Sequence, residues 1–101
     1  MSINLSGLLL PITSPFKSDE TIDTNGLTSN IQKWNSMGVT GYVVLGSTGE
    51  RVNLDEREYL QVIESTREAV PDSMTFIVGA GQQSTRGTIS EVERAATSGA
   101  G

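Results

Sequence analysis

Residues 41–50 have the sequence GYVVLGSTGE. The first half, residues 41–45, is β-branched and aromatic with no alternation of apolar and polar residues. Such a run is typical of a strand buried on both faces of a parallel sheet. The second half, residues 46–50, combines two glycines with two hydroxyl side chains, which predicts a tight polar loop directly after the strand. The stretch therefore predicts an α/β fold.

An apolar run and an amphipathic segment precede this stretch. Residues 8–12 predict a short buried strand, and Pro11 within it favours an edge or irregular strand because proline has no N–H to donate to a neighbour. A helix is expected to begin after a cap at Asp23 or Thr24. Gly38 suits the end of that helix. Its apolar residues are spaced to share one face: Leu27, Ile31 and Trp34.

A second helix is predicted after the polar loop. Asn53 is the expected cap, and Glu56, three residues on, completes a pattern like a capping box. Pro71 ends this helix, since proline does not continue one. The residues expected on its apolar face are Leu60, Ile63 and Val70.

The last third of the chain repeats the pattern. Residues 75–78 predict a third strand, and a third helix is expected to begin near Ser84 or Thr85. The residues expected on the apolar side of that helix are Ile89, Val92 and Ala96. The resulting order, βαβαβα, predicts parallel strands joined by right-handed crossovers.

The strands recur at a constant interval, because Leu8, Gly41 and Met74 are each 33 residues apart. An open doubly wound sheet and a (βα)₈ barrel both fit the alternation, but eight such units make about 264 residues, close to the roughly 250 of a typical barrel. Three parallel strands alone leave strand edges exposed. We therefore expect one partial domain over residues 1–101: the first three βα units of a TIM barrel, incomplete in this chain and part of something larger.

Composition excludes several function classes. The 101 residues contain neither His nor Cys, so a Ser-His-Asp triad, a thiolate nucleophile and a Cys- or His-based metal site are ruled out. The net charge of -5 argues against binding to nucleic acid or to an anionic membrane. No apolar run approaches the length of a spanning helix or a signal peptide. We expect a cytoplasmic protein that binds no metal.

The loop at residues 46–50 is the best candidate site. It follows a buried strand, and ligands bind at the carboxyl ends of parallel strands. Its glycines and hydroxyls are suited to hold a small anion such as a carboxylate. A turn in which the same residues serve only the backbone explains the pattern equally well. The hydroxyl of Ser14 is expected either at the same end of the sheet or in a purely structural role. Residues 79–81, Gly-Ala-Gly, favour a tight turn over a dinucleotide site because the full fingerprint is missing.

Other side chains are expected to be structural or solvated. Lys17, Lys33 and Arg86 lie in polar surroundings and are expected to face solvent. Tyr42 and Tyr59 fall within predicted elements and are expected to pack in the core. Glu50 is expected to bond the backbone or a neighbour near the turn rather than to act as a base.

Four features, in order, resemble the dihydrodipicolinate synthase and N-acetylneuraminate lyase family. Residues 7–16, GLLLPITSPF, resemble its first strand, and residues 46–50, GSTGE, resemble its hallmark G-[TS]-T-G-E. Leu54 with Glu56 and Arg57 resembles the segment that follows the hallmark. Residues 78–85 resemble its third strand and loop. The resemblance covers essentially the whole chain.

The resemblance implies a lyase with a (βα)₈ barrel. Members of the family form a Schiff base between a lysine and pyruvate, then make or break a carbon–carbon bond at the pyruvate methyl carbon. By this resemblance Thr48 binds the pyruvate carboxylate, and Ser47 assists it or serves in a proton relay. No cofactor is implied. A homo-oligomer is expected for the full-length protein. Ser47 stands where the synthases usually have Thr, and a serine there is commoner in the neuraminate lyases and the 4-hydroxy-2-oxoglutarate aldolases. The first strand and third loop are most similar to the 4-hydroxy-2-oxoglutarate aldolases.

One departure from the family is large. The Schiff-base lysine and the tyrosine motif of the family belong to units beyond the third, so neither Lys17 nor Lys33 corresponds to that lysine. We therefore expect this piece alone to be inactive. Two alternatives stay open: a naturally short βα assembly or binding module without catalysis, and, less favoured because no acidic cluster follows the strands, a nucleotide-binding or receiver-like domain.

Overall fold

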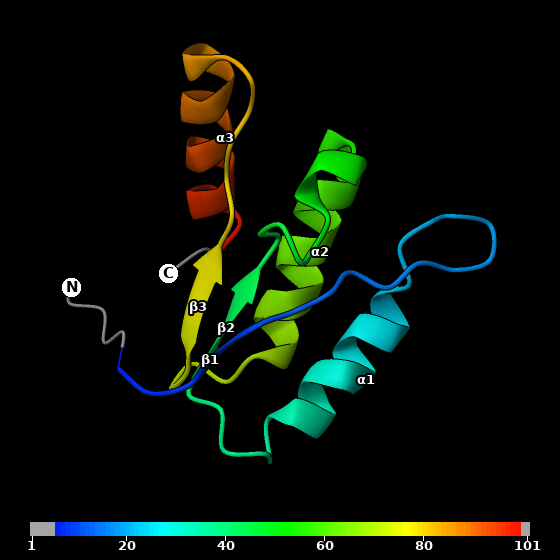
Figure 1. Ribbon diagram of the computed structural model, residues 1–101, viewed down its shortest axis with the longest axis vertical. Coiled ribbons are helices and arrows are strands. Elements are labelled where there is room, and N and C mark those ends of the chain that lie inside the picture. The colour runs from blue at the N-terminus through cyan, green and yellow to red at the C-terminus, as the bar shows by residue number, and fades with distance from the viewer. Residues whose placement is uncertain (1–5, 100–101) are drawn as a thin grey trace.

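Strands and helices alternate throughout the computed structural model, which describes residues 6–99. The elements are β1 (Leu9–Pro11), α1 (Thr24–Trp34), β2 (Gly41–Val44), a 3₁₀ turn η1 (Arg51–Asn53), α2 (Glu56–Ala69), β3 (Thr75–Val78) and α3 (Thr85–Thr97) (Figure 1). The predicted order βαβαβα is confirmed. Among residues 6–99 no helix has the length and apolar character needed to cross a membrane.

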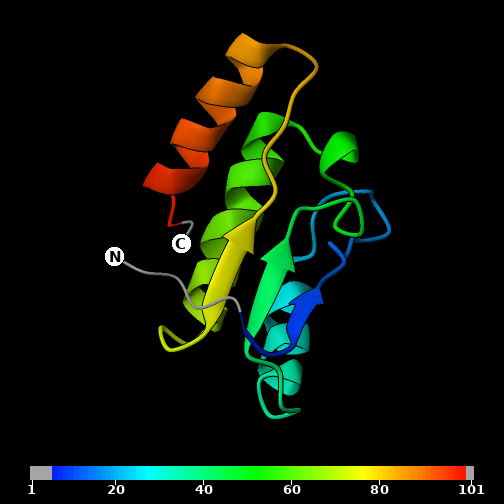
Figure 2. The ribbon, with the colours of Figure 1, turned by 60° about the vertical axis from the view of Figure 1, so that its left-hand side comes forward.

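The sheet is parallel and its strands lie in sequence order, β1-β2-β3. Leu9 pairs with Gly41, and Gly41 with Thr75. Each right-handed crossover connects a strand to its neighbour on the same side, so the helices pack on the same face of the sheet. Figure 2 shows α1 and α2 together behind the strands, with α3 beside α2. Strands in sequence order with their helices on one face are the arrangement of successive units of a (βα)₈ barrel.

The core lies between the sheet and the helices. Tyr42 and Val44 of β2 and Phe76 of β3 face the helices and are buried, whereas Val43 and Ile77 face the other way and are only partly buried. The helix side of β2 is therefore fully buried, whereas the opposite face is buried at Gly41 and only partly buried at Val43. The predicted burial on both faces is seen in part. The helices contribute completely buried side chains to this core: Leu27, Ile31, Tyr59, Val62 and Ile63.

The caps of the helices follow local side-chain chemistry, with one correction. Asp23 caps α1 and Ser84 caps α3, accepting from the N–H of Gly26 and of Gly87. The cap of α2 is Asp55, not Asn53 as predicted. Its carboxylate accepts from the N–H of Glu58 at 2.8 Å, and the Glu58 carboxylate accepts from the N–H of Asp55 at 3.0 Å. This capping box lies two residues further on because η1 takes up residues 51–53.

The predicted apolar side of α3 is wrong. Ile89 is 55% exposed and Val92 51% exposed, and Ala96 is exposed as well. The helix instead buries Glu91 and Ala95, which are four residues apart and so share a face. An ion pair draws Glu91 inward and turns the apolar side chains away from α2.

Candidate functional site

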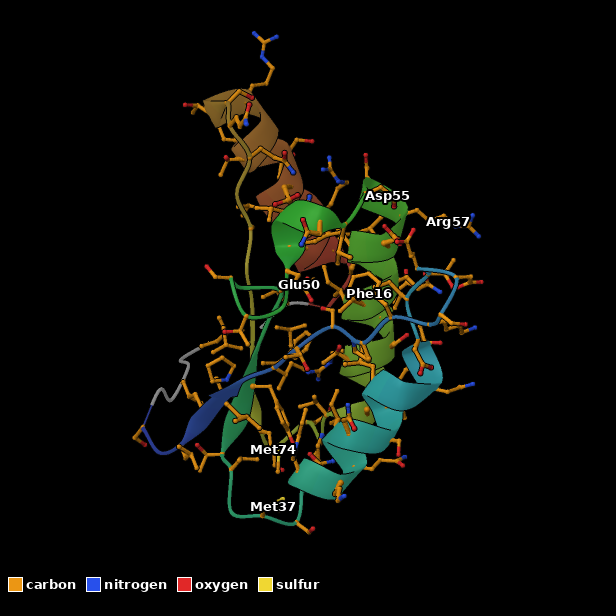
Figure 3. The ribbon with its side chains drawn as sticks, turned by 45° about the vertical axis from the view of Figure 1, so that its right-hand side comes forward. Phe16, Met37, Glu50, Asp55, Arg57 and Met74 are labelled. Carbon is orange, nitrogen blue, oxygen red and sulfur yellow. The ribbon has the colours of Figure 1, made fainter. Side chains whose placement is uncertain are left out.

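The loops that follow the three strands meet at one edge of the sheet. Figure 3 shows Glu50 at this edge, at the opposite end of the sheet from Met37 and Met74. Ser14, which follows β1, is buried, and its hydroxyl donates to the carbonyl of Gly49 at 2.7 Å. The Ser14 hydroxyl thus lies at the predicted end of the sheet and ties the first strand to the loop after the second.

The loop at residues 46–50 has a constrained backbone. The N–H of Gly49 donates to the carbonyl of Gly46, and the N–H of Glu50 to that of Ser47, both at 3.1 Å. Leu45 and Glu50, which flank these turns, have positive φ angles of 62° and 59°. Such angles are uncommon outside glycine, and each costs roughly 1–3 kcal/mol and persists only where the surroundings enforce it. Strained residues of this kind cluster at ligand-binding sites.

Ser47 and Thr48, the predicted site residues, are at the tip of this loop. Both are exposed. Within residues 6–99 neither residue uses its hydroxyl or its backbone N–H in a hydrogen bond. Two hydroxyls and two N–H groups are therefore available on adjacent residues, and an anion such as a carboxylate is stabilised by donors of this kind.

Gly79 is fitted against the start of the same loop. Its N–H donates to the carbonyl of Val44 at 2.7 Å, and a Cβ on Gly79 would lie 2.2 Å from the carbonyl oxygen of Leu45. The phenol of Tyr59 donates to the carbonyl of Gly79 at 2.8 Å. The glycine pattern of residues 79–81 thus reflects a close backbone approach between the loops after β2 and β3, which agrees with the structural interpretation.

A buried ion pair beside the loop has no counterpart among the predicted site residues. The guanidinium of Arg51 donates to Oε1 of Glu91 through Nε at 3.0 Å and also through Nη2. Glu91 accepts further from the N–H of Gly81 at 2.6 Å and from Nε2 of Gln82 at 2.7 Å. Burial alone would raise the pKa of Glu91, but these donors outweigh it and hold that pKa below its usual value.

Sequence reasoning missed this pair for a physical reason. Arg51 and Glu91 are 40 positions apart, so no helical or strand spacing connects them. A glutamate in mid-helix is ordinarily on a solvated face. Glu91 lies outside the predicted apolar positions of α3, so the helical pattern contained no signal for it.

Tyr59 completes the cluster under the loop. The guanidinium of Arg51 lies over its ring, 4.2 Å from the centroid. This is a cation–π contact, in which the negative face of the ring attracts the positive charge. Burial is the main cause that raises the pKa of Tyr59 to about 12 from its ordinary 10.0, and the charge of Glu91 adds to it, while Arg51 and Arg94 oppose it.

The raised pKa of Tyr59 predicts an alkaline loss of stability. The unfolded chain releases the phenol proton near pH 10 but the folded chain near pH 12, so the contribution of Tyr59 is complete below pH 10 and is lost as pH rises to 12. We expect the difference in Tm between the protein and its Tyr59→Phe variant to narrow over that range, as measured by thermal unfolding at successive pH values. A Tm difference between the two proteins that stays constant up to pH 12 would contradict the raised pKa of Tyr59.

The remaining candidates are where the sequence predicted them. Lys17, Lys33 and Arg86 are exposed, and the buried Tyr42 donates to Oδ1 of Asn35 at 2.6 Å. The carboxylate of Glu50 accepts from Nδ2 of Asn53 at 3.2 Å, a local structural contact. In the part of the chain that the structure describes, no three His, Cys, Asp or Glu side chains gather as a metal site would require.

A groove of about 940 Å³ lies beside the cluster, between η1 and the start of α3. Arg51, Gln82 and Arg94 are among the residues that line it. Ser47 and Thr48 are not, so the candidate anion site is the exposed loop rather than this groove.

Comparison with known proteins gives the same assignment from sequence and from structure. The model of the dihydrodipicolinate synthetase family matches residues 4–101. The chain belongs to the dihydrodipicolinate synthetase family. The predicted resemblance is thereby confirmed, and the family members are synthases and lyases.

Two curated relatives give the extent of the match. The 4-hydroxy-tetrahydrodipicolinate synthase of Natronomonas pharaonis is 36% identical over 95 residues, which are 94% of this chain and 32% of that protein. The corresponding synthase of Methanosphaerula palustris is 42% identical over 81 residues, 78% of this chain and 28% of that protein. The chain thus spans about a third of the length of the curated relatives it matches.

Solved structures of the family confirm the partial barrel. A chloride-inhibited dihydrodipicolinate synthase from Acinetobacter baumannii, solved in complex with pyruvate, superposes with a TM-score of 0.91 at 28% identity and covers 96% of this chain and 33% of its own. A dihydrodipicolinate synthase family protein from Coccidioides immitis superposes with a TM-score of 0.87 at 29% identity, over 93% of this chain and 31% of its own.

Proposed function

We propose that this chain is the pyruvate-carboxylate-binding part of a class I lyase that works through a Schiff base. The observation that carries the proposal is the loop tip at Ser47 and Thr48, where four hydrogen-bond donors have no partner within residues 6–99. The loop is at the carboxyl edge of the strands, where barrel enzymes bind substrate. A relative solved with pyruvate bound supports the choice of this acid.

Each site residue has a proposed role. The hydroxyl of Thr48 donates to the pyruvate carboxylate, together with the N–H groups of the loop, and so orients the keto carbon. Ser47 assists the carboxylate or passes a proton. The amine that attacks the keto carbon comes from a lysine outside these 101 residues. Lys33 is excluded because it is in the last turn of α1, at the amino end of the strands, and Lys17 is exposed in a loop.

The test is chemical trapping of the imine. The complete gene product, from its native source, is incubated with pyruvate and borohydride and its intact mass is measured. We expect a mass near three times the 10.8 kDa of this chain, with one reduced pyruvyl adduct on a lysine outside residues 1–101. Borohydride without pyruvate is the control.

Other outcomes would overturn the proposal. An adduct on Lys17 or Lys33 would mean that the assignment of the nucleophile is wrong. A product of 10.8 kDa without an adduct would identify a short module that keeps the loop but not the chemistry.

Ser47 favours the aldolase reaction of the family over the synthase reaction. We propose an aldolase acting on 4-hydroxy-2-oxoglutarate as the second candidate. A serine at position 47 is commoner in that type and in the neuraminate lyases than in the synthases, and the first strand and third loop are most similar to that type. The curated relatives named above are 4-hydroxy-tetrahydrodipicolinate synthases. Release of pyruvate from 4-hydroxy-2-oxoglutarate by the complete gene product would support the aldolase. Synthase activity without that release would exclude it.

A further inference from the structure

We propose that Glu91 is a positioning residue, acting through Arg51, for the loop that binds the pyruvate carboxylate. The inference rests on the proposed function for its substrate but on the contacts of the described residues for its geometry. Glu91 is completely buried, and within residues 6–99 it is the one buried residue that carries a formal charge.

The donors to Glu91 come from two different loops. Arg51 is the first residue after the candidate loop, whereas Gly81 and Gln82 belong to the loop between β3 and α3. One carboxylate on α3 therefore joins the segments that follow the second and third strands. Every one of these contacts involves at least one charged group, and hydrogen bonds of this kind are roughly twice as strong as neutral ones.

Arg51 is held on three sides. Its Nη1 donates to the carbonyl of Leu54 at 2.9 Å, which closes η1. Its guanidinium lies over the ring of Tyr59 while bound to Glu91. Because Tyr59 also holds the carbonyl of Gly79, the position of Arg51 is coupled to the loop after β3 by two routes.

This anchoring acts on a strained neighbour. Glu50, adjacent to Arg51, has the left-handed φ of 59°, and such a conformation persists only where the surroundings enforce it. The opposite end of the loop is held independently by Gly79, whose N–H donates to the carbonyl of Val44. At the Arg51 end, Ser14 holds the carbonyl of Gly49, and Arg51 fixes the residue after Glu50. Loss of the Glu91 charge would loosen the Arg51 anchor, relax Glu50 and move the donors of Ser47 and Thr48.

Stability alone does not account for the pair. Replacing a buried ion pair by apolar side chains of similar volume is often neutral or stabilising. The net contribution of the pair to the free energy of unfolding is therefore expected to be small. What the pair provides is geometry, because it fixes the position of Arg51 and with it one end of the loop.

The test separates positioning from folding in the complete gene product. In Glu91→Gln we expect the pyruvate concentration for half-maximal borohydride trapping to rise about tenfold, with the maximal rate changed by less than about twofold. We expect amide hydrogen exchange at Gly49 and Glu50, whose N–H groups are hydrogen-bonded within the loop, to accelerate by a similar factor. Val62→Ala on α2, whose side chain is completely buried and makes no contact with the Glu91 carboxylate in the hydrogen bonds above, is the control: it lowers Tm but leaves both quantities unchanged.

A double variant sharpens the distinction. Arg51→Met with Glu91→Leu is expected to recover the Tm lost in the Glu91→Gln single variant, while half-saturation and exchange stay raised. Unchanged exchange at Gly49 and Glu50 in Glu91→Gln, or an equal rise in Val62→Ala, would overturn the inference. The hydrogen-exchange measurement needs no pyruvate. Absence of trapping in the unmodified protein would therefore refute the proposed function but not the role of Glu91 in positioning the loop.

Discussion

Replacing Thr48 by Val raises the pyruvate concentration needed for half-maximal imine trapping by about 10- to 100-fold. The substitution keeps the shape of the side chain and removes its hydroxyl. A hydrogen bond to a charged group contributes about 1.5–3 kcal/mol, and each 1.4 kcal/mol is about tenfold in affinity. Thr48 is exposed, so the folded protein keeps its Tm. The measurement is trapping as a function of pyruvate concentration in the complete gene product.

Two controls show whether the weaker pyruvate binding of Thr48→Val results from loss of a contact to the carboxylate. Thr97→Val removes an exposed hydroxyl at the far end of α3, where it donates to the carbonyl of Glu93, and is expected to leave trapping unchanged. Methyl pyruvate has the same keto group without the negative charge, and its half-saturation is expected to be almost the same with and without Thr48→Val. Equal losses with pyruvate and with its ester would show that Thr48 does not bind the carboxylate.

Replacing Gly79 by Ala lowers the free energy of unfolding by about 3 kcal/mol, at the upper end of overpacking effects. The added Cβ would lie 2.2 Å from the carbonyl oxygen of Leu45 and 3.0 Å from the N of Gly46. Both atoms are backbone and cannot rotate away. Leu45 already has a strained φ, so the displaced peptide shifts the start of the candidate loop at residues 46–50, and imine trapping is expected to fall together with stability. Denaturant unfolding measures the first effect.

Gly81→Ala is the matched control for Gly79→Ala. It lies two residues further on in the same loop, and no atom lies within 4 Å of its added Cβ. Its N–H to Glu91 is kept in alanine. We expect a change in stability within about 0.5 kcal/mol, as is usual for surface positions. Equal destabilisation by the two substitutions would show that loop flexibility, not the close approach at Gly79, is what the glycines provide.

Much of the fold was predictable because its signals are local. The apolar run at residues 41–45 and the loop at 46–50 place β2 and its turn within one residue of their observed bounds. The spacing of Leu27 and Ile31 orients α1 correctly. Where two local signals competed, the prediction was wrong: Asn53 and Asp55 both suit a helix cap, and the 3₁₀ turn η1 decided for Asp55.

The candidate site was predictable only in part. Ser47 and Thr48 stand out because hydroxyls and glycines after a buried strand are a recognisable pattern. The supports of the loop do not stand out. The bond from Ser14 to Gly49 spans 35 positions, and the pair of Arg51 with Glu91 spans 40, so neither has a local period that a sequence pattern can reveal.

Local signals in the sequence were sufficient to predict the alternation of strands and helices and the position of the polar loop, and the 101 residues contain no histidine or cysteine. Alternation and loop position follow from backbone propensity and apolar periodicity, which act over a few residues. Two features could be known only from the folded chain: Glu91 rather than Ile89 or Val92 is buried, and Gly79 contacts Leu45. Burial, ion pairing and steric contact depend on which segments meet in space, and distant segments meet only once the sheet has formed.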